Sequence, residues 1–462
     1  MDRRQRLVLA IAVLASFVAF LDGSVINVAL PAIGRELGGG LAVQQWIVDA
    51  YLITLGSLIL VAGSLSDVYG RIVVIRFGLI GFALTSIACA LAPTGFFLIV
   101  ARGLQGVAGA LLVPSSLALI LSTFRGAAQG TAIGRWTAWT SAAFLLGPVL
   151  GGVFVDLLSW RLVFAINVVP IAVTLWLLMR LGQKDEPIPG ERVDIVGAIL
   201  AVVGLGAPVF ALIEQGNFGW GSPMIWIPLL VGIASFTAFL LRQQTSERPM
   251  MPLGLFRVRN FGIGNIATFA IYGALSLGSF VLTIYLQQGA GYSATLAGAA
   301  FLPVTVLNIA LSSYFGTLSA RIGPRLFMTA GPLVAALGFV LLLRVDESAD
   351  YFAQVLPGVL VFGLGLSITV APLTAAILGS IDTAQAGIGS AINNAVSRIA
   401  GLVAIALIGI IVGPRLDDEG YARGVVATVV LLALGATISF IGIRNPGRAG
   451  TSPPGAHGTP SA

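Results

Sequence analysis

Three ionisable residues in the first quarter of the chain stand within long apolar stretches. Asp22, Asp49 and Arg102 are each surrounded in sequence by mainly apolar and small residues. A charge inside a membrane-spanning helix costs several kcal/mol unless it is paired, hydrated or neutralised, so each is a functional candidate. A carboxylate in apolar surroundings and near an arginine can bind and release a proton. The three residues therefore predict a proton-coupling site, in which the permanently charged Arg102 orients and tunes the acids.

Asp22 is the main proton carrier that we expect, and Asp49 is the second candidate. At 1.5 Å per residue from the expected helix ends, Asp22, Asp49 and Arg102 lie about 12, 7 and 9 Å from one face of the membrane, so they share a depth. The alternative for either acid is a structural role, as a cap or a hydrogen-bond partner of a neighbouring helix.

Arg398 is a fourth charge within an apolar stretch, about 16 Å from the nearer end of its expected helix. The later half of the chain offers it no acid within a predicted span. Two alternatives stay open: the side chain extends toward the cytoplasm, or it contacts Asp67 or Asp382.

The elements that must position these residues are membrane-spanning helices. Of the 462 residues 57% are hydrophobic and only 10% are charged, well below the charge of soluble domains. Because hydrocarbon satisfies no backbone group, about 20 consecutive apolar residues predict a spanning helix. Apolar runs predict fourteen spans, at about 7–29, 44–64, 72–91, 96–121, 131–155, 161–180, 193–213, 223–241, 261–286, 295–318, 325–344, 351–378, 387–412 and 424–443.

Basic residues predict the orientation. Arg3, Arg4 and Arg6 precede the first span, and most other basic residues fall on the same side, which places both termini in the cytoplasm. The net charge of +6 is spread over short loops, so it fits contact with membrane lipids and excludes a nucleic-acid site. Cys89 and His457 are the single cysteine and histidine, which leaves no metal centre and no indication of a cofactor.

The chain divides around its seventh and eighth spans. We expect a six-helix bundle over 1–181, two linking helices within 182–245, a second six-helix bundle over 246–445 and a disordered tail over 446–462. Gly63 to Gly70 (GSLSDVYG) recurs loosely as Gly316 to Gly323 (GTLSARIG), after the second span of each half. The recurrence favours an internal repeat, which in transporters places the binding site between the halves.

Gly63 to Arg71, GSLSDVYGR, resembles the cytoplasmic loop signature of the major facilitator superfamily. Gly63 and Gly70 permit close packing and a tight turn, and Asp67 supplies an anion. The resemblance implies that Asp67 contacts the other half and locks one conformation, with Arg71 in the same network. Ile72 and Val73 replace further basic residues of the family pattern. The alternative is a solvated turn.

One segment of the predicted fifth span contains a proline and three glycines: Gly147, Pro148, Gly151 and Gly152. The proline lacks a backbone N–H donor and the glycines lack side chains, so helices can approach closely and bend there. A gating role and a purely structural one are both compatible with this pattern. The segment resembles the antiporter signature of the fourteen-span drug:proton antiporter branch of the superfamily. Other segments similar to that branch are Leu21 to Pro31, Leu98 to Gly106, Trp160 to Pro170 and, more loosely, Gly387 to Asn393.

The resemblance implies an all-α membrane protein of the major facilitator fold in a bacterial cell membrane. It also implies a secondary transporter that exports small hydrophobic substrates in exchange for protons. Two acids in an apolar cavity favour lipophilic cations among them. The alternatives are a porter for one endogenous metabolite or antibiotic and, remotely, an intramembrane enzyme, for which the spans lack histidine and paired cysteines.

Overall fold

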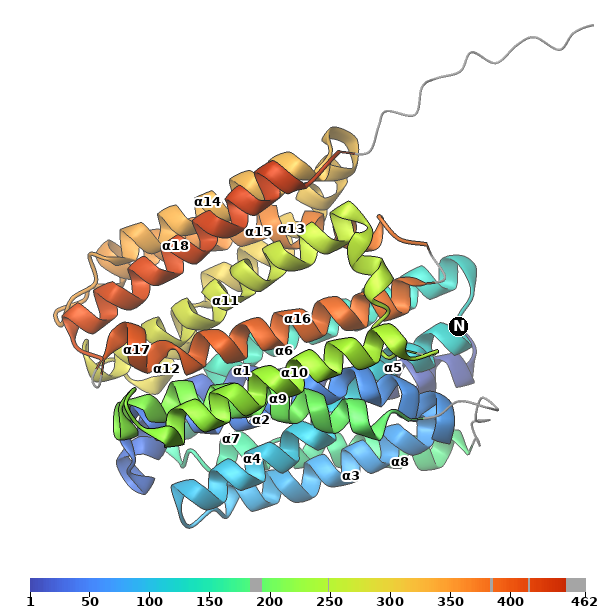
Figure 1. The fold of residues 1–462 in the computed structure, drawn as a ribbon, viewed down its shortest axis with the longest axis horizontal. Coiled ribbons are helices and arrows are strands. Elements are labelled where there is room, and N and C mark those ends of the chain that lie inside the picture. Colours follow the sequence, from blue (N-terminus) through green and yellow to red (C-terminus); the bar gives the residue numbers. More distant parts are fainter. Residues whose placement is uncertain (183–192, 248, 383–384, 414–415, 446–462) are drawn as a thin grey trace, which may run out of the picture.

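The computed structural model is a bundle of long helices that run roughly parallel to one another (Figure 1). It describes residues 1–182, 193–247, 249–382, 385–413 and 416–445. The polar stretch 183–192 and the tail 446–462 lie outside the described residues. Elements of the first part are α1 (Arg3–Leu37), α2 (Gly40–Tyr69), α3 (Arg71–Ala90), α4 (Gly95–Ala110), α5 (Leu112–Thr123), α6 (Gly126–Leu157), α7 (Leu162–Ala165), α8 (Val168–Leu181), α9 (Ile195–Phe218) and α10 (Pro223–Thr245).

The second part is also built from long helices, with short helical turns between them. Its elements are η1 (Leu253–Arg257), α11 (Arg259–Gln288), α12 (Ala294–Ala299), α13 (Leu302–Ile322), α14 (Pro324–Leu342), η2 (Tyr351–Val355), α15 (Leu356–Leu378), α16 (Ala386–Ala406), α17 (Ile408–Val412) and α18 (Asp418–Gly442).

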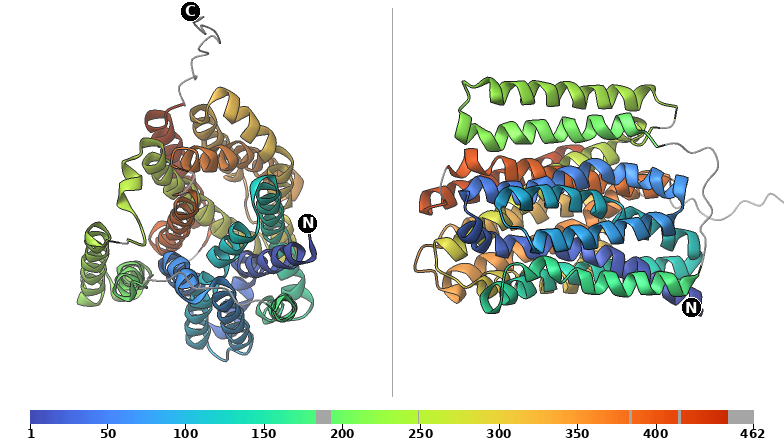
Figure 2. Two further views of the ribbon diagram at one scale, coloured as in Figure 1. Left: turned by 90° about the vertical axis from the view of Figure 1, so that its right-hand side faces the viewer. Right: turned by 90° about the horizontal axis from the view of Figure 1, so that it is seen from below.

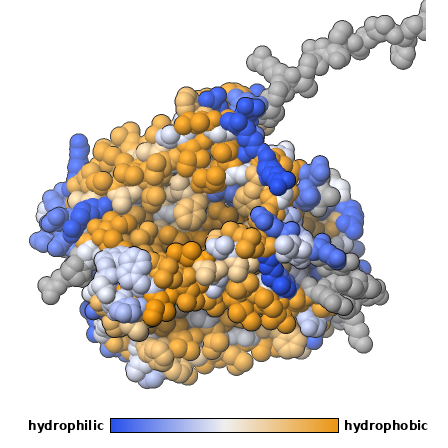
Figure 3. Space-filling model, in the orientation of Figure 1, coloured by the Kyte–Doolittle hydropathy of each residue, from blue (hydrophilic) through white to orange (hydrophobic). Residues whose placement is uncertain are grey.

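Helix length and composition agree with a polytopic membrane protein. Among the described residues, 13 helical segments are long and apolar enough to cross a membrane. The 32-residue α6 stands where the fifth span is predicted, and its Leu146–Leu157 segment is apolar but shorter. The count of fourteen spans therefore stays a prediction. Apolar side chains cover the middle of the face in Figure 3, with hydrophilic ones at both ends.

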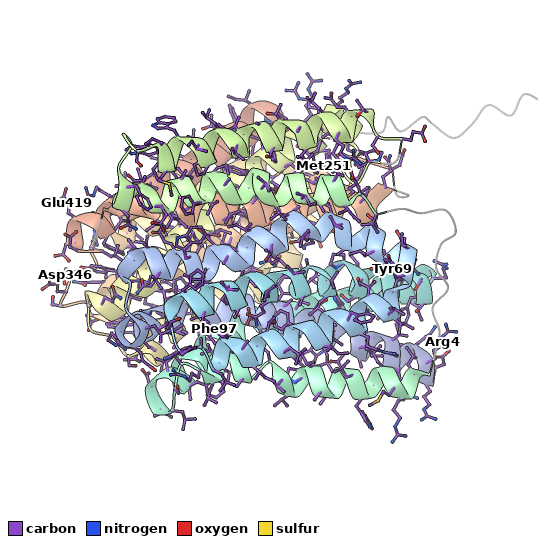
Figure 4. The ribbon with its side chains drawn as sticks, turned by 60° about the horizontal axis from the view of Figure 1, so that its bottom comes forward. Arg4, Tyr69, Phe97, Met251, Asp346 and Glu419 are labelled. Atoms are coloured by element: carbon purple, nitrogen blue, oxygen red, sulfur yellow. The ribbon has the colours of Figure 1, made fainter. Side chains whose placement is uncertain are left out.

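The two ends of the bundle differ in their residues. Arg4 and Tyr69 lie at one end and Asp346 and Glu419 at the other, as the predicted alternation requires (Figure 4). We call the end that carries Arg4 the inner end and the opposite end the outer end.

Prolines explain several breaks within the spans. A proline at position i cannot donate to the carbonyl of residue i−4, so the helix loosens there. Pro114 follows the break that ends α4 at Ala110, Pro170 follows the short α7, and Pro303 follows the end of α12 at Ala299. The π-helical turn η2 precedes Pro357 in the same manner. One expected span can therefore be two helical pieces, as in α4 with α5 and α12 with α13.

Most helices pack within two groups, joined along two seams. α1 packs mainly on α6 and α2 on α4, whereas α11 packs on α18 and α14 on α15. The first seam is made by α2 with α16 and the second by α6 with α12. α9 and α10 form a separate layer (Figure 2), in which α9 contacts α2 and α16 beside the first seam.

The loops of the loose repeat occupy equivalent places. Gly70 joins α2 to α3 with φ of 88°, and Gly323 joins α13 to α14 with φ of 107°. Both positions need a positive φ, which glycine adopts without strain. The sequence recurrence thus corresponds to one turn geometry that is used twice.

Candidate functional site: a buried ion pair and two seams between the halves

The centre of the first half holds a buried ion pair between Asp22 of α1 and Arg102 of α4. Arg102 Nη1 lies 2.5 Å from Asp22 Oδ2, and both side chains are completely buried. Arg102 Nε also donates to the carbonyl of Ile47 on α2, at 3.1 Å. A buried pair tolerates its own desolvation only with good geometry and further hydrogen bonds, so its surroundings decide whether it is stable.

Three neutral polar side chains complete this network. Gln105 Nε2 donates to Asp22 Oδ1 at 3.0 Å and Asn167 Nδ2 donates to the same oxygen at 2.9 Å. Arg102 Nη1 donates back to Gln105 Oε1 at 2.7 Å, and Gln105 Nε2 also reaches Ser86 Oγ at 2.9 Å. The carboxylate of Asp22 therefore accepts from three donors on α4 and at the start of α8.

An aromatic wall covers the guanidinium of Arg102. Its Cζ lies 4.2 Å from the ring centre of Tyr51 and 5.7 Å from that of Phe164. Arg102 Nη2 is buried and has no hydrogen-bond partner within the described part of the chain. Cation–π attraction to Tyr51 partly compensates for that missing bond.

Asp49 does not join the ion pair. This differs from the single site that the sequence predicts for Asp22, Asp49 and Arg102. Ile47 and Tyr51 of α2 contact Arg102, so Asp49, two residues from each, points to another side of the helix. Asp49 is completely buried, and neither carboxyl oxygen has a hydrogen-bond partner in the described structure. An ionised carboxylate is very costly in such a place, whereas the neutral acid is much less so.

The neighbours of Asp49 along α2 show which side it occupies. Gln45, one turn earlier, donates from Nε2 to the carbonyl of Ile405 on α16 at 2.6 Å. Gly56, two turns later, faces Arg398 and Ile399 of α16. Residues four and seven apart share a helix face, so Asp49 lies on the face of α2 that forms the first seam.

The second seam joins α6 to α12 near the outer end, and of the predicted residues it uses Pro148 and Gly152. A Cβ on Gly152 would lie 2.5 Å from Thr295 Cα, and a Cβ on Gly298 would lie 2.2 Å from the carbonyl oxygen of Pro148. Gly147 and Gly151 instead pack on α1, against Ser24 and Val25.

Asp156, at the outer end of α6 beyond the predicted apolar segment, strengthens this seam. Its carboxylate accepts from the backbone N–H of Ala294 at 3.0 Å and of Thr295 at 2.8 Å. Burial alone raises the pKa of Asp156, but hydrogen bonds from Thr295, Ala294 and Ser293 outweigh burial and leave the pKa below its ordinary value.

The predicted loop Gly63 to Arg71 lies at the inner end. Asp67 Oδ1 and Arg71 Nη2 form an ion pair at 3.9 Å, with both side chains partly exposed. Gly70 makes the expected turn, but no other atom lies within 4 Å of a Cβ placed on Gly63. The close packing expected at Gly63 is thus absent from this conformation.

Sequence reasoning missed Gln105, Asn167 and Asp156. Gln105 is three residues after Arg102, so it shares a helix face with it, and Asn167 lies within the segment Trp160 to Pro170. Spacing could have indicated Gln105. Asp156 pairs with residues 138 and 139 positions away, which no local pattern shows. Within the described residues, no group of three or more His, Cys, Asp or Glu side chains could hold a metal ion.

Both the sequence and the fold match those of known proteins. The model of the Major Facilitator Superfamily matches residues 12–405. The chain belongs to the major facilitator superfamily. Solved structures of similar fold include a peptide transporter (TM-score 0.69, 17% identity, 95% of this chain and 98% of that one) and a D-xylose–proton symporter (TM-score 0.66, 14% identity, 95% and 98%).

Similar curated members of the superfamily are named for resistance to antibiotics. The chain is 33% identical over 437 residues to the methylenomycin A resistance protein of Bacillus subtilis, covering 94% of this chain and 92% of that protein. It is 35% identical over 417 residues to the multidrug resistance protein Stp of Mycobacterium tuberculosis, covering 88% and 76%. It is 32% identical over 417 residues to the puromycin resistance protein pur8 of Streptomyces alboniger, covering 88% and 82%. The chain is therefore a multi-pass membrane transporter, as its motifs predict, and its relatives are named for drug and antibiotic resistance.

Proposed function

We propose that this transporter exports small hydrophobic drugs or metabolites across the bacterial cell membrane in exchange for protons. Two six-helix units, 1–181 and 246–445, would rock about a central site, with 182–245 linking them and fourteen spans in all. The names of the relatives support the direction of transport. Membrane potential supplies about 2.3 kcal/mol per charge per 100 mV, and a pH gradient about 1.4 kcal/mol per unit, which suffices for uphill export.

The unpartnered carboxyl of Asp49 is the observation that carries the proposed coupling. It lies on the first seam, where α2 and α16 are packed together, and an ionised group there would oppose the packing. Protonation of Asp49 from outside, after substrate has left, would allow the seam to close. The transporter would then face inward without its substrate.

Asp22, which the sequence leads us to expect as the main proton carrier, is the other proton site of this mechanism. Its carboxylate is neutralised by Arg102 in this conformation, so a proton would reach it only when the ion pair loosens. We propose that loosening accompanies the movement of α1 against α4. Gly147, Pro148, Gly151 and Gly152 would form the outer gate, and Gly63, Asp67, Gly70 and Arg71 would bias the conformations from the inner end.

Proteoliposomes with an imposed pH gradient test this proposal. We expect the parent protein to drive uphill transport of at least one member of a panel that holds ethidium, puromycin and tetracycline. Asp49→Asn and Asp22→Asn should both lose uphill transport, while downhill exchange of substrate persists because a neutral residue mimics the protonated acid. Retention of uphill transport by both variants would show that coupling does not run through these acids.

The panel also examines substrate charge. A preference for lipophilic cations, which two acids in an apolar cavity predict, requires that substrate meets those charges. Both acids are completely buried in this conformation. The narrower alternative, a porter for one antibiotic, is favoured by relatives named as a tetracenomycin C resistance and export protein and a probable actinorhodin transporter. Transport of a single panel member would support that alternative.

A further inference from the structure

Arg398 of α16 packs beside Gly56 in the first seam, but its charge takes no part in the buried ion pair. Its guanidinium lies over the ring of Phe20 on α1, with 5.4 Å between Cζ and the ring centre. The residue is partly exposed, and within the described structure it forms no hydrogen bond or ion pair. It therefore contacts neither Asp67 nor Asp382. A permanent charge at this depth is costly without a counter-charge, so the site is incomplete as it stands.

The face of α1 that meets this guanidinium is partly exposed. Phe20, Gly23 and Asn27 share one face of α1 and are all partly exposed. No other atom lies within 4 Å of a Cβ placed on Gly23. Because Phe20 faces Arg398 from the opposite half, this face of α1 is turned toward the other half. This partly exposed face therefore lies between the halves, where a transported molecule must pass.

Neutral donors stand beside Arg398. Asn394 precedes it by one helical turn and shares its face, and the Asn394 side chain has no hydrogen bond in the described part of the chain. Asn393, by contrast, bonds Asn265 and Thr268 within the second half. Within the described residues no carboxylate pairs with Arg398, because Asp22 pairs with Arg102 and neither oxygen of Asp49 has a partner.

We propose that Arg398 and Asn394 bind the acidic group of a hydrophobic substrate, with Phe20 against its apolar body. A guanidinium offers two parallel donors that match a carboxylate, and an adjacent amide can add a third. The substrate class is thus aromatic or aliphatic molecules that carry one carboxylate or acidic phenol. This inference rests on the export proposed above and names one substrate class for it.

A matched probe pair separates the inference from the proposed function. The probes are 7-methoxycoumarin-3-carboxylic acid and its carboxamide, which differ in charge but little in shape. Uphill export of each is measured in proteoliposomes of the parent, Arg398→Gln, Arg398→Lys and the control Arg344→Gln, which alters an exposed residue between α14 and η2.

We expect Arg398→Gln to lower export of the acid about tenfold or more, the loss expected for a charge-assisted hydrogen bond. Export of the carboxamide should persist in that variant, Arg398→Lys should recover part of the acid export, and Arg344→Gln should match the parent. Equal loss of both probes in Arg398→Gln would overturn the inference, because Arg398 would then serve folding or gating. Export of the carboxamide alone by the parent would also overturn it, while the proposed function would stand. A parent that exports neither probe nor any panel compound would refute both.

Discussion

Removing the charge of Asp22 should destabilise the protein strongly, and removing Arg102 as well should restore most of the loss. Asp22→Asn keeps the shape of the side chain but leaves the guanidinium of Arg102 buried without its counter-charge. The amide group introduced by this substitution would also oppose one of the donors that now meet the carboxylate, which come from Arg102, Gln105 and Asn167.

Breaking a completely buried pair in this way costs about 3–5 kcal/mol of folding free energy. In Asp22→Asn/Arg102→Gln the uncompensated charge is gone, so we expect the double variant to lie within about 1–2 kcal/mol of the parent. Glu36→Gln is the control on the same helix. Glu36 pairs with Arg161 at 2.6 Å, but both side chains are substantially exposed, so its loss should cost at most about 1 kcal/mol.

Unfolding by sodium dodecyl sulfate in mixed micelles, followed by circular dichroism, gives the free energies for this cycle. Transport assays on the same samples separate stability from function, since all variants at Asp22 should lose proton coupling. An Asp22→Asn variant that is no less stable than Glu36→Gln would contradict a stabilising role for the buried pair. A double variant that is no more stable than Asp22→Asn would contradict it as well.

Three further predictions concern the movements between conformations. Gly152→Ala should keep the outer seam open and stop turnover, because its Cβ would meet the Thr295 backbone. Cysteine-accessibility labelling measures this opening. The control Gly130→Ala, on the same helix with nothing within 4 Å of the added Cβ, should leave the labelling unchanged. Asp67→Asn should preserve folding but slow turnover at least about tenfold by shifting the inward–outward balance, and unchanged labelling of both faces would contradict this. Because the pKa of Asp156 lies below its ordinary value of 3.8, its bonds to α12 should hold the seam above that pH. The distance between spin labels on α6 and α12 should therefore increase only as pH falls below about 3.8, and Asp156→Asn should remove that dependence.

The sequence predicted the architecture well because hydrocarbon imposes strong local constraints. Runs of about 20 apolar residues can only be helices there, so the spans were located within a few residues of most helix ends. The breaks at Pro114, Pro170 and Pro303 could also have been placed, since each follows from a missing backbone donor. The prediction ends the first span at residue 29, but α1 continues to Leu37. The additional residues include polar ones, so the apolar run does not reveal them.

The candidate site was only partly predictable. Depth along a helix can be counted from the sequence, and it brought Asp22 and Arg102 to one level. The rotation of a helix about its axis depends on its neighbours, so the separation of Asp49 from the pair could not be read from spacing. The contacts of Asp156 with α12 and of Arg398 with Phe20 could not be predicted for the same reason, because both join the two halves of the chain.

The layer of α9 and α10 makes the two seams unequal for anything that arrives through the lipid. α9 packs on both α2 and α16, so a molecule dissolved in the bilayer and approaching the first seam would meet this pair of helices first. The seam of α6 with α12 has no such cover among the described helices (Figure 2). On that side, near the inner end, Arg6, Leu9, Phe17, Arg135 and Trp139 help to line a cavity of about 500 Å³ between α1 and α6. A molecule dissolved in the inner leaflet would therefore enter only from the side of α6 and α12. At the entrance of this cavity it would meet basic residues beside apolar ones.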